Sequence, residues 1–277
     1  MKIIILIVAS NNQEHEADLL CQKNTWVSNC NENVSVIYLR GWNNDFFYRD
    51  EDTLFVPCKE EYSLILNKTI LGIEYILKNL DFDILIRSNV STYFETHRLV
   101  RELNQPKYKQ FFFGGYFDKS SQLAFGNRNS FEYVQGAGIF LSKQAAIEIC
   151  KINPAEFSGV FEDLVISNFL HTRGFKKIRI ARNNLQSTHL FIPTFYIRTK
   201  NSANPKSACR RMYLIHEFFQ AKNTMNKIVA YLKIQANEIS EFHKHSEPNY
   251  LYLVKNWIVL KSFLKMKIRK SFILKRD

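Results

Sequence analysis

The chain has 277 residues, of which 46% are apolar and 14% aromatic, so it can bury a full hydrophobic core and lacks the composition of a disordered protein. Its net charge of +12 arises entirely in the C-terminal third: residues 196–277 carry 17 basic and 5 acidic side chains, whereas residues 1–195 carry 21 of each. The sequence contains no run of eighteen apolar residues, which excludes an ordinary membrane-spanning helix.

The apolar N-terminus, residues 2–9, resembles a short signal peptide but predicts a buried strand better. Its apolar core is at the low end of the length that a signal needs, and no small-x-small cleavage site follows in good position. The five cysteines show no Cys-x-x-Cys pair and no metal-ligand spacing: Cys21, Cys30, Cys58, Cys150 and Cys209. We therefore predict reduced thiols, a reducing compartment and a cytoplasmic location.

Strands and helices are predicted to alternate along the first half of the chain. Strands are expected at 2–9, 34–39, 54–56 and 82–87, and helices at 14–30 and 62–80. The second of these helices is strongly amphipathic, because Ile65, Thr69 and Ile73 recur every four residues. This β-α-β-α-β order predicts an α/β fold with a mostly parallel sheet of the nucleotide-binding kind.

The second half continues the pattern and then becomes helical. Strands are expected at 111–116, 133–141 and 176–181, with further strand and loop over 183–204, and helices at 96–103, 143–151, 162–171, 208–236 and 250–270. Ser142 is a good N-cap for the helix that follows it, and Gly174 is a typical helix stop. We predict two parts: an α/β domain over residues 1–205 and a basic helical region over residues 206–277.

The candidate site lies in residues 82–94, where an apolar run of strand length ends in small polar residues. Ligands of open α/β sheets bind just beyond the carboxyl ends of strands. The predicted ligand-binding side chains at this strand end are Arg87, Ser88, Asn89 and Ser91. Ser10 and Asn11 follow the first strand in the same way, and an ordinary polar turn is the alternative for them.

Five local patterns occur in order along residues 2–182. They are Glu60-Glu61-Tyr62 with Lys68-Thr69, the stretch 82–94, Phe112-Phe113-Gly114-Gly115, the stretch 133–142 with its Gly-Ala-Gly, and Phe161-Glu162-Asp163-Leu164. In order and spacing they resemble the fringe and β1,3-galactosyltransferase class of GT-A glycosyltransferases, family 31 and its relatives. The resemblance implies an inverting hexosyltransferase-like enzyme that uses a nucleotide sugar.

The resemblance also implies roles for particular residues. Asp163 is the expected general base for the acceptor hydroxyl, with Glu162 in support, although the helix dipole alone explains acids in a first turn. Lys68 is expected to bind or buttress the donor; a surface lysine on an amphipathic helix is the alternative. The predicted acceptor-binding residues are Gln135, Gly136 and Ala137, and a bulged strand is the alternative explanation for the glycines here.

The chain departs from the family at the metal motif. Where the family has Asp-x-Asp to hold Mn²⁺ or Mg²⁺ against the diphosphate, this chain has Asn89-Val90-Ser91, whose amide and hydroxyl are poor ligands for a hard dication. Asp81-Phe82-Asp83 has the Asp-x-Asp pattern, but it precedes the strand, whereas the metal motif of the family follows it. Either the protein is a catalytically inactive carbohydrate- or nucleotide-binding protein, or side-chain cations replace the metal. The candidate cations are Lys68, Arg87, His189, Arg198 and Lys200.

The basic C-terminal third bears on partners. Residues 195–200 interleave aromatic and basic side chains, which is typical of a loop that closes over a diphosphate, but also of an amphipathic strand. Residues 250–270 place Leu253, Trp257 and Leu260 on one helical face and lysines largely on the others, which suits either an anionic membrane surface or docking on the core. No nucleic-acid-binding signature occurs. The expected partners are a nucleotide-sugar donor and a glycan or lipid-linked acceptor, as in lipopolysaccharide or capsule assembly.

Overall fold

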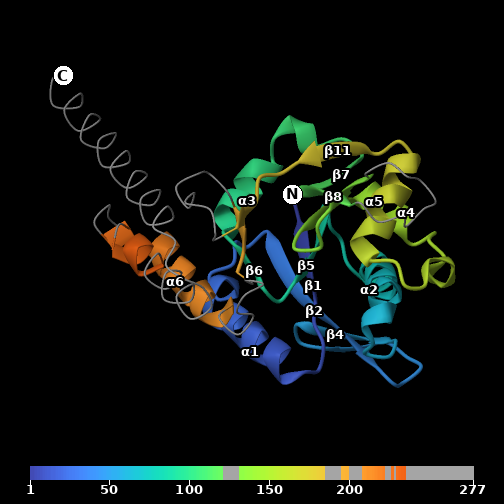
Figure 1. The fold of residues 1–277 in the computed structure, drawn as a ribbon, viewed down its shortest axis with the longest axis horizontal. Helices are drawn as coiled ribbons and strands as arrows, with labels where there is room; N and C mark the ends of the chain where they lie inside the picture. Colours follow the sequence, from blue (N-terminus) through green and yellow to red (C-terminus); the bar gives the residue numbers. More distant parts are fainter. Residues whose placement is uncertain (121–130, 185–194, 200–207, 222–225, 228, 235–277) are drawn as a thin grey trace.

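A computed structural model describes residues 1–120, 131–184, 195–199, 208–221, 226, 227 and 229–234 (Figure 1). Its centre is an eight-stranded sheet in the order β11-β7-β10-β5-β1-β2-β4-β3. The strands are β1 (Ile3–Val8), β2 (Val34–Trp42), β3 (Tyr48–Asp50), β4 (Thr53–Pro57), β5 (Ile84–Asn89), β7 (Phe112–Gly115), β10 (Ile139–Ser142) and β11 (Lys176–Arg179). Each pair of neighbours is parallel except where β10 or the edge strand β3 takes part, so the predicted mostly parallel sheet is confirmed.

Helices cover both faces of this sheet. They are α1 (Gln13–Gln22), which continues as the π-helix η1 (Lys23–Val27), α2 (Ile65–Asn79), α3 (Thr96–Leu103), α4 (Lys143–Ile149), α5 (Glu162–Thr172) and α6 (Ala208–Gln220). Figure 1 shows α1, α3 and α6 on one side of the sheet and α2, α4 and α5 on the other. The predicted helix-strand alternation therefore builds a three-layer α/β architecture.

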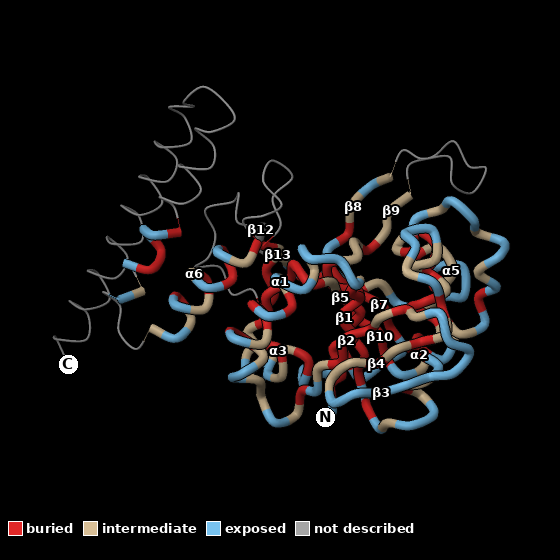
Figure 2. Tube along the Cα trace, turned by 90° about the horizontal axis from the view of Figure 1, so that it is seen from below, coloured by how far each residue is buried: buried red, intermediate tan, exposed pale blue. Residues whose placement is uncertain are grey.

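The strand β1 shows why the sheet is buried on both faces. All six of its residues are buried: Ile3, Ile5 and Ile7 join the core beneath α1 and α3, while Ile4 and Leu6 join the core beneath α2 and α4. A continuous apolar run of this kind is typical of a central parallel strand. Figure 2 shows the same result as buried, red segments concentrated in the central strands.

Two smaller sheets border the main one. One contains β6 (Thr92–Phe94), β13 (Tyr196–Arg198) and β12 (Asn183–Asn184), and the other pairs β8 (Phe117–Ser120) with β9 (Phe131–Val134). The strand predicted over 133–141, with an interruption at Gly136 and Gly138, is two strands: β9 and β10 are separated at these glycines by a turn in which the Gly138 N–H donates to the Gln135 carbonyl, 3.2 Å. The two glycines thus lie in or beside a tight turn and not within a bulged strand.

The prediction of one helix over 208–236 is wrong, because α6 ends at Gln220 and the described residues 226, 227 and 229–234 are helical separately. The Tyr231 and Ile234 side chains of this later segment share the hydrophobic core with Ile215 of α6. The predicted amphipathic helix over 250–270 lies outside the described residues. Within the described part of the chain, no helix has both the length and the hydropathy needed to cross a bilayer.

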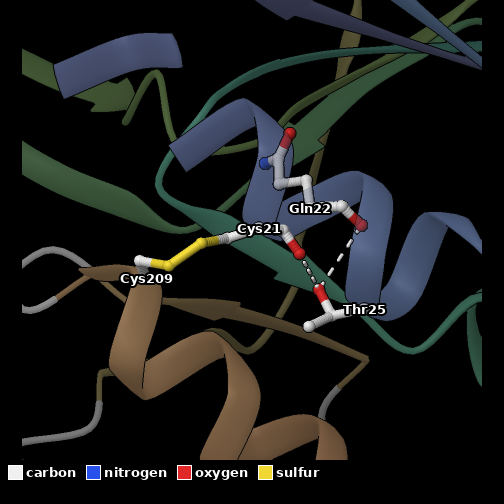
Figure 3. The surroundings of a disulfide bond; sticks show 4 residues. All are labelled: Cys21, Gln22, Thr25 and Cys209. Carbon is white, nitrogen blue, oxygen red and sulfur yellow. Dashed lines mark hydrogen bonds between the residues drawn. A yellow bond between two sulfur atoms is a disulfide. The ribbon is translucent and has the colours of Figure 1, made fainter. Parts of the chain in front are cut away.

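A disulfide joins α1 to α6, between Cys21 and Cys209 (Figure 3). The two cysteines are 188 residues apart, yet the packing of α6 on α1 brings their Cα atoms to 5.6 Å. The prediction that all five cysteines are reduced thiols is therefore wrong for this pair. The argument for a reducing, cytoplasmic compartment loses the observation on which it depended.

Candidate active site

The carboxyl ends of β1, β2 and β5 meet the beginning of β10 at one edge of the sheet. Because β10 runs antiparallel to β5, its first residue, Ile139, lies opposite Arg87 near the end of β5. The turn before β10 is then fastened to β5 and β6 through a single carbonyl. Ala137 O accepts the Ser88 hydroxyl at 2.8 Å and the Thr92 hydroxyl at 3.0 Å. The predicted donor-side stretch and the predicted acceptor-side turn are thus brought together.

A buried ion pair between Arg87 and Glu162 occupies the centre of this edge. The guanidinium binds both carboxylate oxygens, through Nε at 2.9 Å and through the second terminal nitrogen, and its remaining nitrogen donates to Gly136 O at 2.5 Å. Both side chains are less than a tenth exposed. The Thr69 hydroxyl adds a further hydrogen bond to the carboxylate, 2.5 Å. Burial raises the pKa of Glu162, and Arg87 and Thr69 act in the opposite direction.

Asp163 is the half-buried carboxylate next in sequence, in the first turn of α5. Its Oδ2 accepts the Gly136 N–H at 3.1 Å, and its Oδ1 accepts the Leu164 N–H at 3.0 Å. Burial raises the pKa of Asp163, although Arg87 and these two N–H groups oppose the shift. A carboxylate with a raised pKa is a stronger base than an ordinary aspartate.

The glycine that binds Asp163 is constrained on its other side as well. A Cβ atom on Gly136 would lie 2.8 Å from a terminal nitrogen of Arg87 and 3.7 Å from the Asp163 carboxylate. The main chain of Gly136 therefore links the two charged groups: its carbonyl accepts from Arg87 and its N–H donates to Asp163. This close approach requires the absence of a side chain.

Lys68 is buried, and its ammonium donates to Ala9 O and to Glu60 Oε2, each at 2.8 Å. The same carboxylate accepts the Gly41 N–H through its other oxygen. Lys68 thus ties the end of β1 to the loop before α2 and to the end of β2. Of the two predicted roles, this geometry fits a buttress of the site better than a cation exposed to ligand.

The loop after β1 carries the predicted residues Ser10 and Asn11, and two side chains that were not predicted bind them: His15 of α1 and Arg40 of β2. The Ser10 N–H donates to His15 Nδ1 at 3.0 Å, and the hydroxyl of the same serine lies 2.8 Å from this nitrogen. Arg40, at the end of β2, donates to Asn11 Oδ1 at 3.2 Å and pairs with Glu16 at 2.5 Å. Only the strand order, which sets β2 beside β1, reveals that Arg40 belongs here.

The residues at the usual metal position do not fit a hard dication. The Asn89 side-chain oxygen already accepts the Ser91 hydroxyl at 3.0 Å and the Thr92 hydroxyl at 2.9 Å. Among the described residues, no three His, Cys, Asp or Glu side chains are grouped closely enough to hold a metal ion. Asp81 and Asp83 lie before β5 and pair with Lys2, at the opposite edge of the sheet. The side chains that could bind a metal ion at this position are therefore neutral, and they are already hydrogen-bonded to one another.

Two arginines converge on one neutral amide beside the turn. Arg182 and Arg198 both donate to Gln135 Oε1, at 2.5 Å and 3.4 Å. Arg198 was predicted to bind the donor, whereas Arg182, whose guanidinium stacks over the Tyr116 ring at 4.3 Å, was missed. The amide of Gln135 donates in turn to Asp118. The predicted cations His189 and Lys200 lie outside the described residues.

Comparisons with known proteins identify the fold. No protein-family model and no curated protein matches the sequence. Many solved structures superpose on it, among them two glycosyltransferases. The first is a glycosyltransferase involved in the glycosylation of the major capsid of PBCV-1, with TM-score 0.51, 10% identity, and coverage of 77% of this chain and 100% of that one.

The second is the galactosyltransferase LgtC in complex with donor and acceptor sugar analogues, with TM-score 0.50, 12% identity, and coverage of 80% of this chain and 98% of that one. At such identities the likeness concerns the fold alone, and it does not distinguish the fringe class from other glycosyltransferases. The chain has the mixed α/β fold of the GT-A glycosyltransferases, with a large, mostly parallel sheet flanked by helices.

Proposed function

We propose that this protein is a glycosyltransferase that moves a sugar from a nucleotide-sugar donor to a hydroxyl of a glycan or lipid-linked glycan. The observation that carries the proposal is Asp163, a half-buried carboxylate with a raised pKa, held by Gly136 at the carboxyl edge of a GT-A sheet. Ligands of such sheets bind at this edge. The motifs that resemble the fringe class support inversion at the anomeric carbon.

The proposed reaction is a single displacement. The acceptor oxygen attacks the anomeric carbon, the bond from that carbon to the phosphate oxygen breaks, and the nucleoside diphosphate leaves with the bonding electron pair. Asp163 takes the proton of the acceptor hydroxyl as the new bond forms. Glu162 and Arg87 act as positioning residues, because their bidentate pair and the Arg87 contact to Gly136 O hold the main chain that binds Asp163.

Other side chains take supporting parts in this proposal. Ser10 and Asn11 lie at the carboxyl end of β1, where the nucleoside is expected, and Lys68 holds that loop in place. Ser88 fixes Ala137, so the acceptor-side turn and the donor-side strand keep one geometry. Because the donor set at Asn89 does not fit Mn²⁺ or Mg²⁺, no step of the proposed reaction passes through a metal.

The test is a screen of UDP-, GDP- and CMP-sugars for thermal stabilisation, followed by donor turnover with and without EDTA. A ligand that binds the native state raises the melting temperature. We expect Asp163→Asn to keep the donor-induced shift and to lose about 10²–10⁴-fold in turnover, the usual contribution of a positioned base. The matched control is Glu148→Gln on α4, an acid that pairs with Lys151 and Arg173. Undiminished turnover in Asp163→Asn would show that Asp163 is not the general base.

The second candidate function is a catalytically inactive carbohydrate- or nucleotide-binding protein of the same fold. The neutral, self-satisfied cluster of Asn89, Ser91 and Thr92 favours it, since this is where the fold family places acidic metal ligands. Donor-induced stabilisation without turnover over a broad acceptor panel would select this alternative. The cytoplasmic location and a contact with anionic membranes remain predictions, the latter from tail residues outside the described ones.

A further inference from the structure

The cations of the candidate site differ in how fully the protein itself satisfies them. Arg87 has acceptors for all three guanidinium nitrogens, two of them on a full negative charge. Lys68 is buried against a carboxylate and a carbonyl. Neither is placed to accept a new anion without breaking a buried contact.

In the part of the chain that the structure describes, Arg182 and Arg198 are not paired with a carboxylate in this way. They share one neutral amide oxygen, and among the described residues neither Nε has a hydrogen-bond partner although both atoms are buried. Burial is the main cause that lowers the pKa of Arg182, and the positive charge of Arg198 acts in the same direction. The carboxylate of Asp118 accepts from the NH₂ of Gln135, on the side of the amide away from the oxygen that the two arginines share.

The pair lies inside the candidate site. In the sheet register Arg198 is opposite Thr92, and the next residue, Thr199, donates its N–H to Ser91 O at 2.8 Å. On the other side, Gln135 directly precedes Gly136, the residue that binds Asp163.

We propose that Arg182 and Arg198, aligned by Gln135, form a binding site for the diphosphate of the donor and neutralise it without a metal ion. Paired guanidinium groups match phosphate oxygens in geometry and charge. They would stabilise the negative charge that develops on the leaving diphosphate, which is where a transferase needs its electrostatic contribution. This role rests on the proposed glycosyltransferase function, but the anion site itself is testable alone.

The site explains two observations together. The cluster at Asn89 offers no charge to a dication. The positive charge that a diphosphate needs is supplied by Arg198 of β13, the strand that pairs with β6, and by Arg182 in the segment after β11. Gln135, predicted to bind the acceptor, becomes a positioning residue that holds the two guanidinium groups side by side.

The experiment is calorimetric titration of the full chain with inorganic pyrophosphate in EDTA. We expect the wild type to bind, and Arg182→Gln and Arg198→Gln each to bind about tenfold or more weakly, the effect of losing a charged hydrogen bond. The control is Arg179→Gln, which removes an exposed arginine of the same strand end that pairs with Glu132. Its pyrophosphate affinity is expected to equal that of the wild type.

A second variant separates ligand binding from folding. Gln135→Glu, made together with Asp118→Asn so that the new carboxylate does not face an existing one, places a negative charge between the two guanidinium groups. A purely structural role for the arginines is then preserved while the anion is excluded. We expect loss of pyrophosphate binding with a cooperative melting transition retained. Wild-type affinity for pyrophosphate in Arg182→Gln, in Arg198→Gln or in the Gln135→Glu variant overturns the proposal. The proposal also fails if the wild type does not bind pyrophosphate, or binds it only when Mn²⁺ is present.

Failure of the anion site and failure of the proposed function are distinguishable. If the arginine variants lose pyrophosphate but no donor sugar is consumed by the wild type, the anion site stands and the transferase does not. If sugar transfer is seen and is unchanged in the arginine variants, the transferase stands and the anion site does not.

Discussion

Two of the arginine centres at the carboxyl edge of the sheet have opposite surroundings. Arg87 is buried in a bidentate pair with Glu162 and also binds a carbonyl, so its charge is balanced within the protein. Arg182 and Arg198 share a single neutral oxygen and retain buried nitrogens without partners among the described residues. A balanced cation shapes a site, whereas an unbalanced pair leaves attraction for an anion from solution.

The two arginine centres should differ most in how much their replacement lowers the free energy of unfolding. Replacing Arg87 with Met leaves Glu162 buried and unpaired, and we expect a loss of about 3–5 kcal/mol in the free energy of unfolding. Replacing Arg182 with Met removes one bond to a neutral amide and one ring contact, for which about 1 kcal/mol is expected. Urea unfolding of the two variants makes the measurement.

The double variant Arg87→Met with Glu162→Leu is the matched control for that comparison. It removes both charges, so it should recover most of the stability that the single Arg87 variant loses. Equal losses for Arg87→Met and Arg182→Met would contradict the distinction between a structural and a ligand-facing arginine.

Removal of the Cys21–Cys209 disulfide tests whether α6 supports the pair of Arg182 and Arg198. Arg211 of α6 donates to Thr199 O at 3.0 Å, next to Arg198, so α6 supports the strand that carries Arg198. The three guanidinium nitrogens of Arg87 bind Glu162 and Gly136 instead, neither of which belongs to α6. We expect Cys209→Ser to cost about 2–4 kcal/mol in unfolding free energy and to weaken pyrophosphate binding. Cys150→Ser, which alters a cysteine outside the disulfide, is the control and should change neither. Unaltered stability in Cys209→Ser would show that α6 is held without the disulfide.

Gly136 is the point where the main chain joins the balanced centre to the proposed base. Gly136→Ala places a methyl group 2.8 Å from Arg87, and overpacking of this kind costs about 1–3 kcal/mol. Donor turnover should fall beyond what that loss of stability explains, because the N–H bound to Asp163 shifts. Gly159→Ala is the control: its φ of +78° strains an alanine, but a Cβ there meets nothing within 4 Å. A Gly136→Ala enzyme with full turnover would detach the main chain from catalysis.

The smallest expected effect concerns pH and Asp163. Its pKa is raised above the ordinary 3.8, so the protonated form stabilises the fold and that contribution is lost as pH rises from 3.8 through the folded pKa. Asp163→Asn should therefore gain stability relative to the wild type over this window and keep the gain at neutral pH. The acidic limb of the wild-type kcat/KM profile should lie above 3.8 for the same reason. Thermal melts across pH check the first expectation, and a variant less stable than the wild type at neutral pH would contradict it.

Much of the fold follows from local sequence pattern. The apolar run at residues 3–8 predicts a central strand, and the period of the helix around Ile73 predicts α2, since both signals reside in neighbouring residues. The position of Arg87 at the end of β5 follows as well, because it depends only on where one apolar run stops. The partner of Arg87 does not follow, since Glu162 lies 75 residues further along the chain.

What the sequence by itself determined is the alternation of strands and helices, the mostly parallel sheet and the edge at which the site is sought. The tertiary structure alone decided that Cys21 meets Cys209, that Arg87 is consumed by Glu162 and that Arg182 stands beside Arg198. The physical reason is the separation along the chain of the residues involved. Periodicity depends on residues a few positions apart, whereas charge balance depends on which distant strands and helices pack together.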